Sequence, residues 1–489
     1  MKDLKGKAIR GGVVKVCAQI LNFILRIGSL VVLARLLEPS DFGLVGMVTA
    51  VTGVFSLFKD AGLSMATVQR AVITDEEIST LFWINILVGA ILALVSMVGA
   101  PILVAFYNEP RLFWVTIAIA SGFVLNAAGV QHAALLQREM RFIALATIEI
   151  ISLLVSIAIG ISMAVNGCGY WSLVGMAVIL PAAYTVCSWF ASTWKPGMPR
   201  KRAGVLSMLR FGGTITLNNI IVYAAYNLDK VLLGRFWGAD ALGIYGRAYQ
   251  LINIPADNLY TAIGGVAYSA LSRLQDDRDR LKSYFIKGYS LVLSMSLPIT
   301  IACALFADDI IYIFLGPKWM DAVTIFRLLA PTVLVFALIN PLSWLLFSLG
   351  LINRSLKMAL VIAPLVITAY SIGLPYGPNG VAIGYSFMLL LLTVPLIAWA
   401  IHGTTISMRD ICRTAGPPII SIIIAAVPAL AVNIYFGPMI TPLPRLALGC
   451  TVLLISYLWL LFYVMRQKAF YMTMFKELRW LSSQGEGER

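Results

Sequence analysis

The sequence predicts an all-α integral membrane protein with about 14 transmembrane helices: two six-helix lobes related by an internal repeat, plus two extra C-terminal helices. Three observations support this fold class. Of the 489 residues, 60% are hydrophobic and only 12% are charged, whereas soluble domains hold about 45–50% apolar and about 25% charged residues. The apolar runs are about 20 residues long without alternation, which indicates helices rather than strands. A sixteen-residue pattern also occurs twice along the chain.

The repeated pattern links residues 31–46, VVLARLLEPSDFGLVG, with residues 231–246, VLLGRFWGADALGIYG. Each stretch ends a long apolar run, crosses a short polar corner and begins another run. At an offset of 200 residues, Leu33, Arg35, Gly43 and Gly46 recur as Leu233, Arg235, Gly243 and Gly246. Transporters commonly build two lobes around a central path from such repeats. We therefore expect two related lobes here.

Fourteen apolar segments follow one another along the chain. They span approximately 11–36, 41–62, 79–105, 112–133, 142–165, 169–193, 207–234, 241–270, 284–307, 322–349, 356–375, 379–402, 414–436 and 443–465. The segments 41–62 and 241–270 hold the most polar residues, and a twelve-helix chain would omit two segments. Because all the connections are short, none leaves room for a catalytic domain outside the membrane.

A basic loop divides the two copies of the repeat. Residues 194–203, WKPGMPRKRA, contain two prolines, one glycine and four basic residues, as expected of a cytoplasmic linker. The predicted domains are an N-terminal lobe at 1–194, this basic cytoplasmic linker at 195–206, a C-terminal lobe at 207–402, two further helices at 403–465 and a cytoplasmic tail at 466–489.

The distribution of lysine and arginine predicts the orientation, since cytoplasmic loops of membrane proteins carry an excess of both. With the N-terminus in the cytoplasm, 28 of the 37 basic residues fall at the cytoplasmic side, seven at the opposite side and two inside spans. This bias predicts that both termini are cytoplasmic and that the number of helices is even. It also accounts for the net charge of +14 better than nucleic-acid binding does, so no nucleic-acid partner is expected.

The sequence lacks the motifs of the common enzyme classes. It contains no GxSxG, HExxH or Walker sequence, the two histidines are far from any carboxylate cluster, and the six cysteines have no metal-binding spacing. We therefore expect no enzyme activity, no metal and no cofactor. Without an ATP site, transport work must come from an H⁺ or Na⁺ gradient or from the gradient of the substrate.

Polar side chains inside the apolar segments indicate the candidate binding site. Their insertion into a bilayer costs free energy, so such residues usually have a functional or structural role. In the first segment Lys15, Gln19, Asn22 and Arg26 recur at spacings of four, three and four residues, so they share one helical face. At the repeat offset, the seventh segment carries a similar stripe. Its members are Asn219, Tyr223, Tyr226 and Lys230.

The eighth segment adds Arg247 and Asp257 on one face, with Pro255 predicted to kink the helix between them. Two inward-facing stripes would enclose a hydrated, mildly cationic cavity, which suits a diphosphate or an acidic sugar because arginine binds phosphate through two parallel hydrogen bonds. Asp257 and Asp229 are the candidates for ion coupling. The alternative is structural: Arg26 would pair with Glu149 or Asp257 only to tie helices together.

The basic first helix, the stretch LARLLEPSDFGLVG, the sequence FKDAGL at 58–63 and the plan of six, six and two helices together resemble a known family. They are similar to the polysaccharide-transporter branch of the multidrug/oligosaccharidyl-lipid/polysaccharide flippases, in particular to Wzx-type exporters of lipopolysaccharide, O-antigen and colanic acid. The resemblance implies two lobes in a V shape, with a central cavity between helices 1, 2, 7 and 8.

The same resemblance implies a flippase that moves undecaprenyl-diphosphate-linked oligosaccharides across the bacterial inner membrane. Cavity arginines of the family contact the lipid diphosphate, a role that would fall to Arg26 and then to Arg247. Expected partners are the lipid-linked substrate, membrane lipids, and the polysaccharide polymerase with its chain-length machinery.

Two other functional classes stay open. A drug or cation antiporter of the same superfamily would show an excess of acidic cavity residues. A membrane polymerase or ligase would need a large periplasmic loop, which this sequence lacks.

Overall fold

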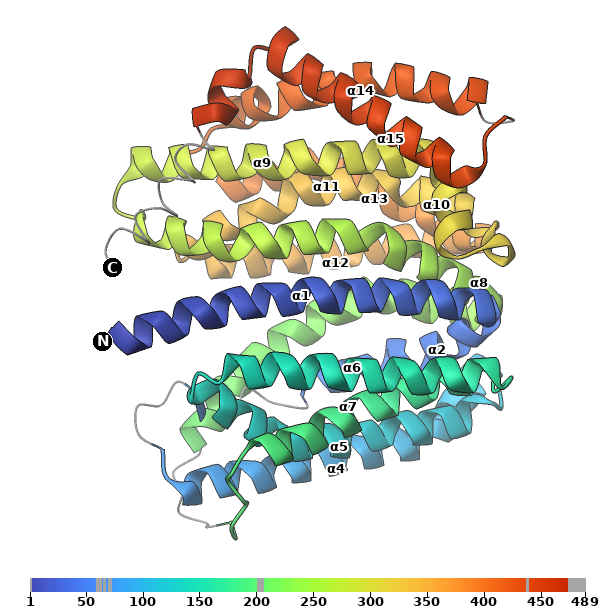
Figure 1. The fold of residues 1–489 in the computed structure, drawn as a ribbon, viewed down its shortest axis with the longest axis vertical. Helices are drawn as coiled ribbons and strands as arrows, with labels where there is room; N and C mark the ends of the chain where they lie inside the picture. The colour runs from blue at the N-terminus through green and yellow to red at the C-terminus, as the bar shows by residue number, and fades with distance from the viewer. Residues whose placement is uncertain are drawn as a thin grey trace. The chain divides into compact units, whose positions relative to one another are not determined.

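The computed structural model describes residues 2–58, 64, 67–68, 73–199, 206–436 and 439–473, and Figure 1 shows that they form helices joined by short connections. No strand occurs among these residues, which confirms the predicted all-α class. The chain divides into two compact units: residues 1–246 with 314–318, and residues 247–313 with 319–489. The predicted domain boundaries stay a prediction.

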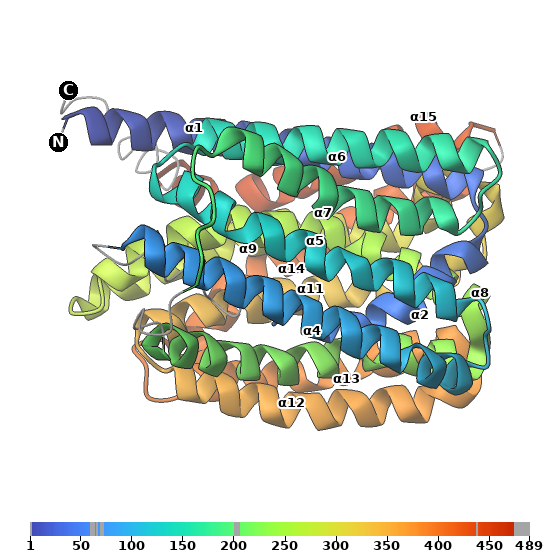
Figure 2. The same cartoon turned by 90° about the horizontal axis from the view of Figure 1, so that it is seen from below.

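The first unit is a bundle of long helices. Its elements are α1 (Lys2–Leu36), α2 (Pro39–Ser56), α4 (Asp75–Tyr107), α5 (Leu112–Arg138), α6 (Phe142–Val165), α7 (Trp171–Ala191) and the first part of α8 (Leu206–Arg273). In this unit α4 packs on α5, α5 on α7, α7 on α6, and α6 on α1, an order that can be followed in Figure 2. The helix α1 therefore lies beside α6, although more than 100 residues separate them.

The second unit contains the end of α8 and most of the remaining elements. These are α9 (Arg278–Leu305), α10 (Ala307–Phe314), α11 (Ala322–Ser348), α12 (Ile352–Gly373), η2 (Leu374–Tyr376), α13 (Gly377–Ile401), α14 (Met408–Phe436), α15 (Pro442–Trp459) and the π-helical turn η3 (Leu460–Val464). Here α11 packs on α9 and α13, α12 packs on α13, and α14 packs on α9 and α15. The short η1 (Pro317–Trp319) is divided between the two units, because residues 314–318 belong to the first.

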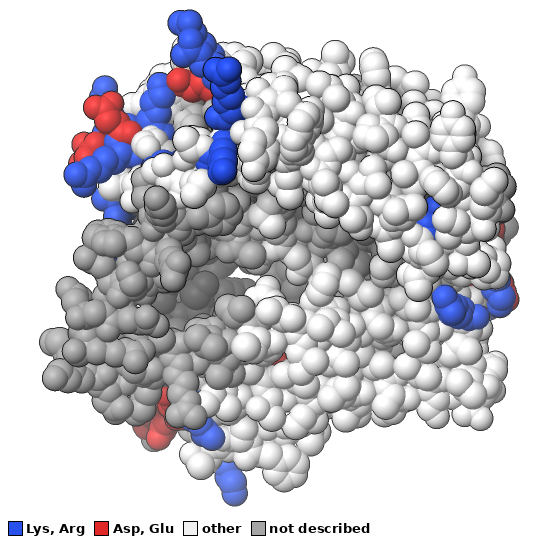
Figure 3. All heavy atoms as spheres, turned by 45° about the horizontal axis from the view of Figure 1, so that its top comes forward, with Lys and Arg blue, Asp and Glu red and all other residues white. Residues whose placement is uncertain are grey.

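The surface of the helices is that of a membrane protein. Ten helical stretches of the described chain are long and apolar enough to cross a bilayer, with residues 352–401 counted once although they hold both α12 and α13. Large apolar side chains stand outward, such as Phe190 (88% exposed) and Ile102 (70% exposed), as expected where lipid replaces water. Figure 3 shows that the charged side chains on one face gather mainly toward its ends. The chain is therefore a multi-pass membrane protein.

The long helix α8 contains a break that corresponds to the corner of the first repeat. Gly238 has φ 81° and ψ −174°, a conformation that interrupts the helix and that glycine adopts without steric cost. At the repeat offset of 200 residues, Gly238 corresponds to Glu38, the N-cap of α2. The two halves of α8 thus correspond to α1 and α2, as the repeat predicts.

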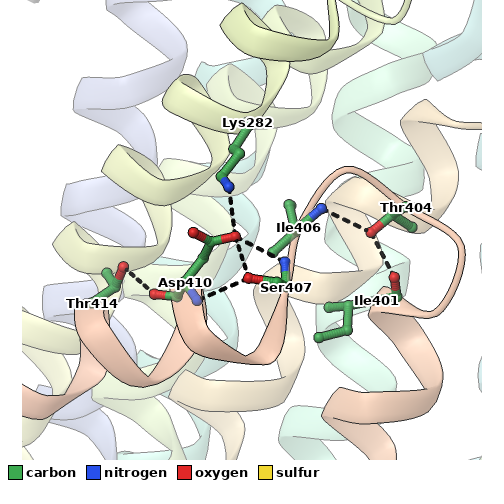
Figure 4. Close-up of polar contacts among 7 residues, drawn as sticks. All are labelled: Lys282, Ile401, Thr404, Ile406, Ser407, Asp410 and Thr414. Atoms are coloured by element: carbon green, nitrogen blue, oxygen red, sulfur yellow. Dashed lines mark hydrogen bonds and ion pairs between the residues drawn. The ribbon is translucent and has the colours of Figure 1, made fainter.

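Helix ends on one side of the second unit are fixed by a small polar network, drawn in Figure 4. Ser407 precedes α14, and its backbone N–H and its hydroxyl donate to Oδ2 of Asp410 at 2.9 and 2.7 Å. Lys282 of α9 reaches the same carboxylate, with Nζ 2.6 Å from Oδ2. In return the backbone N–H of Asp410 donates to Oγ of Ser407 at 3.3 Å. This reciprocal cap satisfies one of the free N–H groups of α14, and the lysine ties α14 to α9.

In the first unit, α2 and the second half of α8 cross with their backbones in contact. A Cβ atom at Gly43 would lie 1.7 Å from the carbonyl oxygen of Ala239, and one at Gly243 would lie 1.9 Å from the carbonyl oxygen of Pro39. These two contacts are equivalent at the repeat offset, because residue 39 corresponds to 239 and residue 43 to 243. The crossing thus has an approximate two-fold symmetry, and only glycine fits its centre.

This crossing can be tested by adding one methyl group. Gly243→Ala should destabilise the protein by about 1–3 kcal/mol, because backbone atoms on both sides would have to move. The midpoint of thermal unfolding of the protein in detergent should fall by several degrees. Gly246→Ala is the matched control three residues along α8, where a Cβ atom meets nothing within 4 Å. Equal midpoints for both variants would contradict the close contact.

Candidate functional site

The first unit contains a cavity of about 590 Å³ between its helices. Helices α1, α2, α5, α6 and α7 each contribute to its wall. The polar and charged lining residues are Asn22, Arg26, Thr49, Thr52, Ser56, Asn126, Glu149 and Tyr184. Apolar residues such as Phe123 and Leu153 complete the wall. A concave wall that combines apolar side chains with converging polar groups is typical of a ligand site.

Arg26 brings a positive charge into this cavity. It lies on α1, one helical turn after Asn22, and both side chains line the cavity. Arg26 is exposed and forms no ion pair with any residue of the described chain. Within the described part of the first unit, the alternative pairing of Arg26 with Glu149 is therefore not formed. The guanidinium is available to an anionic ligand.

Glu149 brings the opposite charge from α6. The Nδ2 atom of Asn22 donates to Oε2 of Glu149 across 3.4 Å, which is long for a hydrogen bond and therefore weak. Glu149 is exposed to the cavity. The cavity thus combines one cationic and one anionic side chain without an ion pair between them.

A second cavity of about 370 Å³ adjoins the first. It shares Asn126, Glu149 and Tyr184 with the first cavity. These residues come from α5, α6 and α7, and they form a common wall that we call the shared wall. The two cavities therefore meet at these three side chains within the first unit.

Tyr223 of the predicted stripe on α8 packs against α2. Its hydroxyl donates to the backbone carbonyls of Thr49 and Ala50, at 3.2 and 3.4 Å. A Cβ atom at Gly53 would lie 1.9 Å from this hydroxyl, so Gly53 makes room for the tyrosine. Since Thr49 and Gly53 line the first cavity, Tyr223 supports the cavity wall.

Asp229 and Lys230 lie further along α8 and face different partners. Asp229 is fully buried, and its Oδ2 accepts a hydrogen bond from the hydroxyl of Tyr245 at 2.9 Å. Lys230 donates from Nζ to Oδ1 of Asn227 at 2.7 Å.

The other predicted site residues are distributed over both units. Gln19 is exposed on α1 and lines neither cavity. In the second unit, Arg247 donates to Oε1 of Gln250, and Asp257 is exposed on the same helix. The side chains of Lys15, Asn219 and Tyr226 lie outside the described part of the structure.

Sequence reasoning missed the shared wall as a binding feature. Glu149 was considered only as a pairing partner of Arg26, and Asn126 and Tyr184 were not considered. The available signal was the isolation of Glu149, which is the one charged residue of the apolar segment 142–165. No group of three or more His, Cys, Asp or Glu side chains could hold a metal ion within the described residues.

Comparison with known proteins gives relatives of similar size. The chain is 26% identical over 402 residues to the lipopolysaccharide biosynthesis protein WzxC of Escherichia coli (strain K12), with 80% of each chain covered. It is 29% identical over 296 residues to the teichuronic acid biosynthesis protein TuaB of Bacillus subtilis (strain 168), which covers 60% of this chain and 61% of the relative.

The fold also has a solved counterpart. The lipid II flippase MurJ in its inward closed conformation matches with a TM-score of 0.71 over 94% of this chain and all of its own, at 12% sequence identity. This likeness supports the fold. The family model described as polysaccharide biosynthesis protein matches residues 32–324, which is more than half of the sequence, and the resemblance predicted from the sequence is confirmed. The chain belongs to the polysaccharide biosynthesis protein family.

Proposed function

We propose that this protein is a flippase that moves lipid-linked oligosaccharide units across the bacterial inner membrane by alternating access. The family, the biosynthetic names of the relatives in Escherichia coli and Bacillus subtilis, and the flippase with the same fold support this proposal. The substrate would be an undecaprenyl-diphosphate-linked polysaccharide repeat unit. Membrane lipids surround the protein, and a polysaccharide polymerase with its chain-length machinery would consume the product.

The observation that carries the proposal is the position of Arg26 in an apolar helix, facing a cavity and without an ion pair in the described structure. Burying a positive charge in a membrane helix costs at least about 2.5–3.5 kcal/mol on insertion scales. That cost is offset if the cavity is hydrated and the charge meets an anionic ligand. Arg26 would bind the diphosphate through two parallel hydrogen bonds and lower the barrier for its passage. Asn22 would contribute a neutral hydrogen bond beside it.

Substitution of Arg26 tests this role. Arg26→Ala should lower the rate of flipping at least roughly tenfold, because a charge-assisted hydrogen bond contributes about 1.5–3 kcal/mol. Arg26→Lys should retain part of the rate, since the charge stays but the planar fork is lost. The rate is measured with a fluorescent lipid-linked oligosaccharide in proteoliposomes, and the amount of protein in the membrane is measured in parallel.

Arg111→Ala serves as the control, because Arg111 pairs with Glu109 in an exposed loop and such pairs contribute little to stability. Normal flipping by Arg26→Ala would contradict the binding role. Failure of both Arg26 variants to accumulate would instead favour a structural role for Arg26.

We propose further that Asp257 and Asp229 couple transport to an H⁺ or Na⁺ gradient. Asp257 is exposed, and its carboxylate accepts no hydrogen bond from the described residues, so it is open to a proton or an ion. Asp229 is buried against Tyr245. Carboxylates inside membrane helices commonly belong to proton relays or ion pathways.

Coupling is tested by removing the charge. Asp257→Asn should make flipping independent of an imposed proton gradient in proteoliposomes while the protein still accumulates, because the amide cannot release a proton. Asp276→Asn, in the exposed connection after α8, is the control and should keep the gradient dependence. Unchanged gradient-driven flipping by Asp257→Asn would remove Asp257 from the mechanism.

We also propose fourteen membrane crossings with both termini in the cytoplasm. The ten candidate spans become eleven when α12 and α13 are counted separately. The helix α2 and the two halves of α8 bring the number to fourteen. The excess of lysine and arginine on one side supports the orientation.

Reporter fusions test the topology. Alkaline phosphatase fused after Glu109, between α4 and α5, should be active because this loop is expected in the periplasm. The same reporter fused after Arg489 should be inactive. Activity of the fusion at Arg489 would overturn the proposed orientation.

A further inference from the structure

The shared wall lies next to the proposed diphosphate position. Glu149 contacts Asn22, and Asn22 is four residues before Arg26, which is about 6 Å along a helix at 1.5 Å rise per residue. A diphosphate at Arg26 would therefore place the group bonded to it about one helical turn away, beside Glu149. In a lipid-linked oligosaccharide the diphosphate is bonded to the prenyl chain on one side and to the first sugar on the other. Of these two groups, the sugar matches the hydrogen-bonding side chains of the shared wall, which a hydrocarbon chain does not.

The side chains of the shared wall have unused hydrogen-bonding capacity. Within the described structure the amide of Asn126 and the hydroxyl of Tyr184 form no hydrogen bond, and both line the two cavities. Glu149 accepts only the long bond from Asn22. A carboxylate, an amide and a phenol together offer several acceptors and donors, which is the chemistry needed to bind the hydroxyl groups of a sugar ring.

The charge at the shared wall is negative. Glu149 is the one charged residue among the described residues that line the second cavity, and in the first cavity it is joined only by Arg26. A carboxylate repels a second anion held close to it, at about 4 Å, even for an effective dielectric constant of about 20. The same carboxylate accepts hydrogen bonds from hydroxyl or ammonium groups.

We infer that Asn126, Glu149 and Tyr184 form the subsite for the first sugar of the lipid-linked substrate, and that Glu149 selects a neutral or amino sugar against an acidic one. This inference rests on the proposed function, with the diphosphate bound at Arg26. The sequence predicts a cavity that suits either a diphosphate or an acidic sugar. The present inference keeps only the first: Arg26 binds the diphosphate, and the sugar beside it is not acidic.

The experiment compares two probes that differ in one group. Farnesyl-diphospho-glucose and farnesyl-diphospho-glucuronic acid have the same lipid and diphosphate, and a carboxylate replaces the hydroxymethyl group in the second. The Kd of each is measured by titration of the purified full-length protein in detergent. The wild type should bind the glucose probe at least roughly tenfold more tightly, since two like charges held close together repel one another.

Substitutions then assign this preference to Glu149. Glu149→Gln should bring the two Kd values within about twofold of one another, chiefly by tighter binding of the acidic probe, because the repelling charge is removed. Glu149→Asp should keep the preference, because it keeps the charge. Glu139→Gln is the matched control: Glu139 follows α5, pairs with Arg141 and lines neither cavity, so its preference should equal that of the wild type.

Equal binding of both probes by the wild type would overturn the inference. Because this measurement uses only the wild-type protein, misfolding of a variant cannot affect it. An unchanged preference in Glu149→Gln would overturn the assignment to Glu149. The diphosphate position is tested separately, since Arg26→Ala should weaken both probes alike. If Arg26→Ala binds both probes as the wild type does and the preference persists, the proposed role of Arg26 fails while the sugar subsite stands.

Discussion

A charge inside a membrane-spanning helix must meet water, a counter-charge or a ligand, because the hydrocarbon interior of a bilayer solvates ions poorly. The first unit depends on this constraint. Its helices leave a cavity where Arg26 from α1 and Glu149 from α6 are exposed, and neither is paired with the other within the described residues. A fully packed bundle would have to neutralise or exclude both groups. Both charged groups are instead open to the cavity of the first unit.

The scaffold around the cavity depends on close contact between backbones. Gly43 and Gly243 let α2 and the second half of α8 cross without side chains between their backbones. Tyr223 then reaches α2 and donates to carbonyls beside the cavity. Small residues thus bring the second copy of the repeat against the first within one unit, and the polar lining of α2 is held in place by this packing.

The sequence predicted the helices well and the distant contacts poorly. Long apolar runs predicted α4, α6 and α9. Each of these helices is apolar along most of its length, because its sides face either other helices or lipid. The repeat located the break at Gly238. The short helix α10 was not predicted, because its Asp308 and Asp309 resemble a loop. Asp309 is in fact buried against Arg445, with Nε 2.8 Å from Oδ2 and 136 residues between them in the chain.

The candidate site was also predicted only in part, where the signal lies within one helix. The stripe on the first helix placed Asn22 and Arg26 on one face, since helical periodicity is a local property. The shared wall could not be predicted, because Glu149 stands alone in an apolar run and reaches Asn22 across 127 residues only when α6 packs on α1. Periodicity within one helix carries no information about which helix lies opposite.

The central claim is that Arg26 binds the diphosphate of a lipid-linked sugar inside the first unit. An electron cryomicroscopy structure of the protein with a bound prenyl-diphospho-sugar tests it most directly. We expect diphosphate density within hydrogen-bonding distance of the Arg26 guanidinium, and density for the first sugar beside Glu149. Density for the diphosphate outside this cavity, with no ligand at Arg26, would contradict the account.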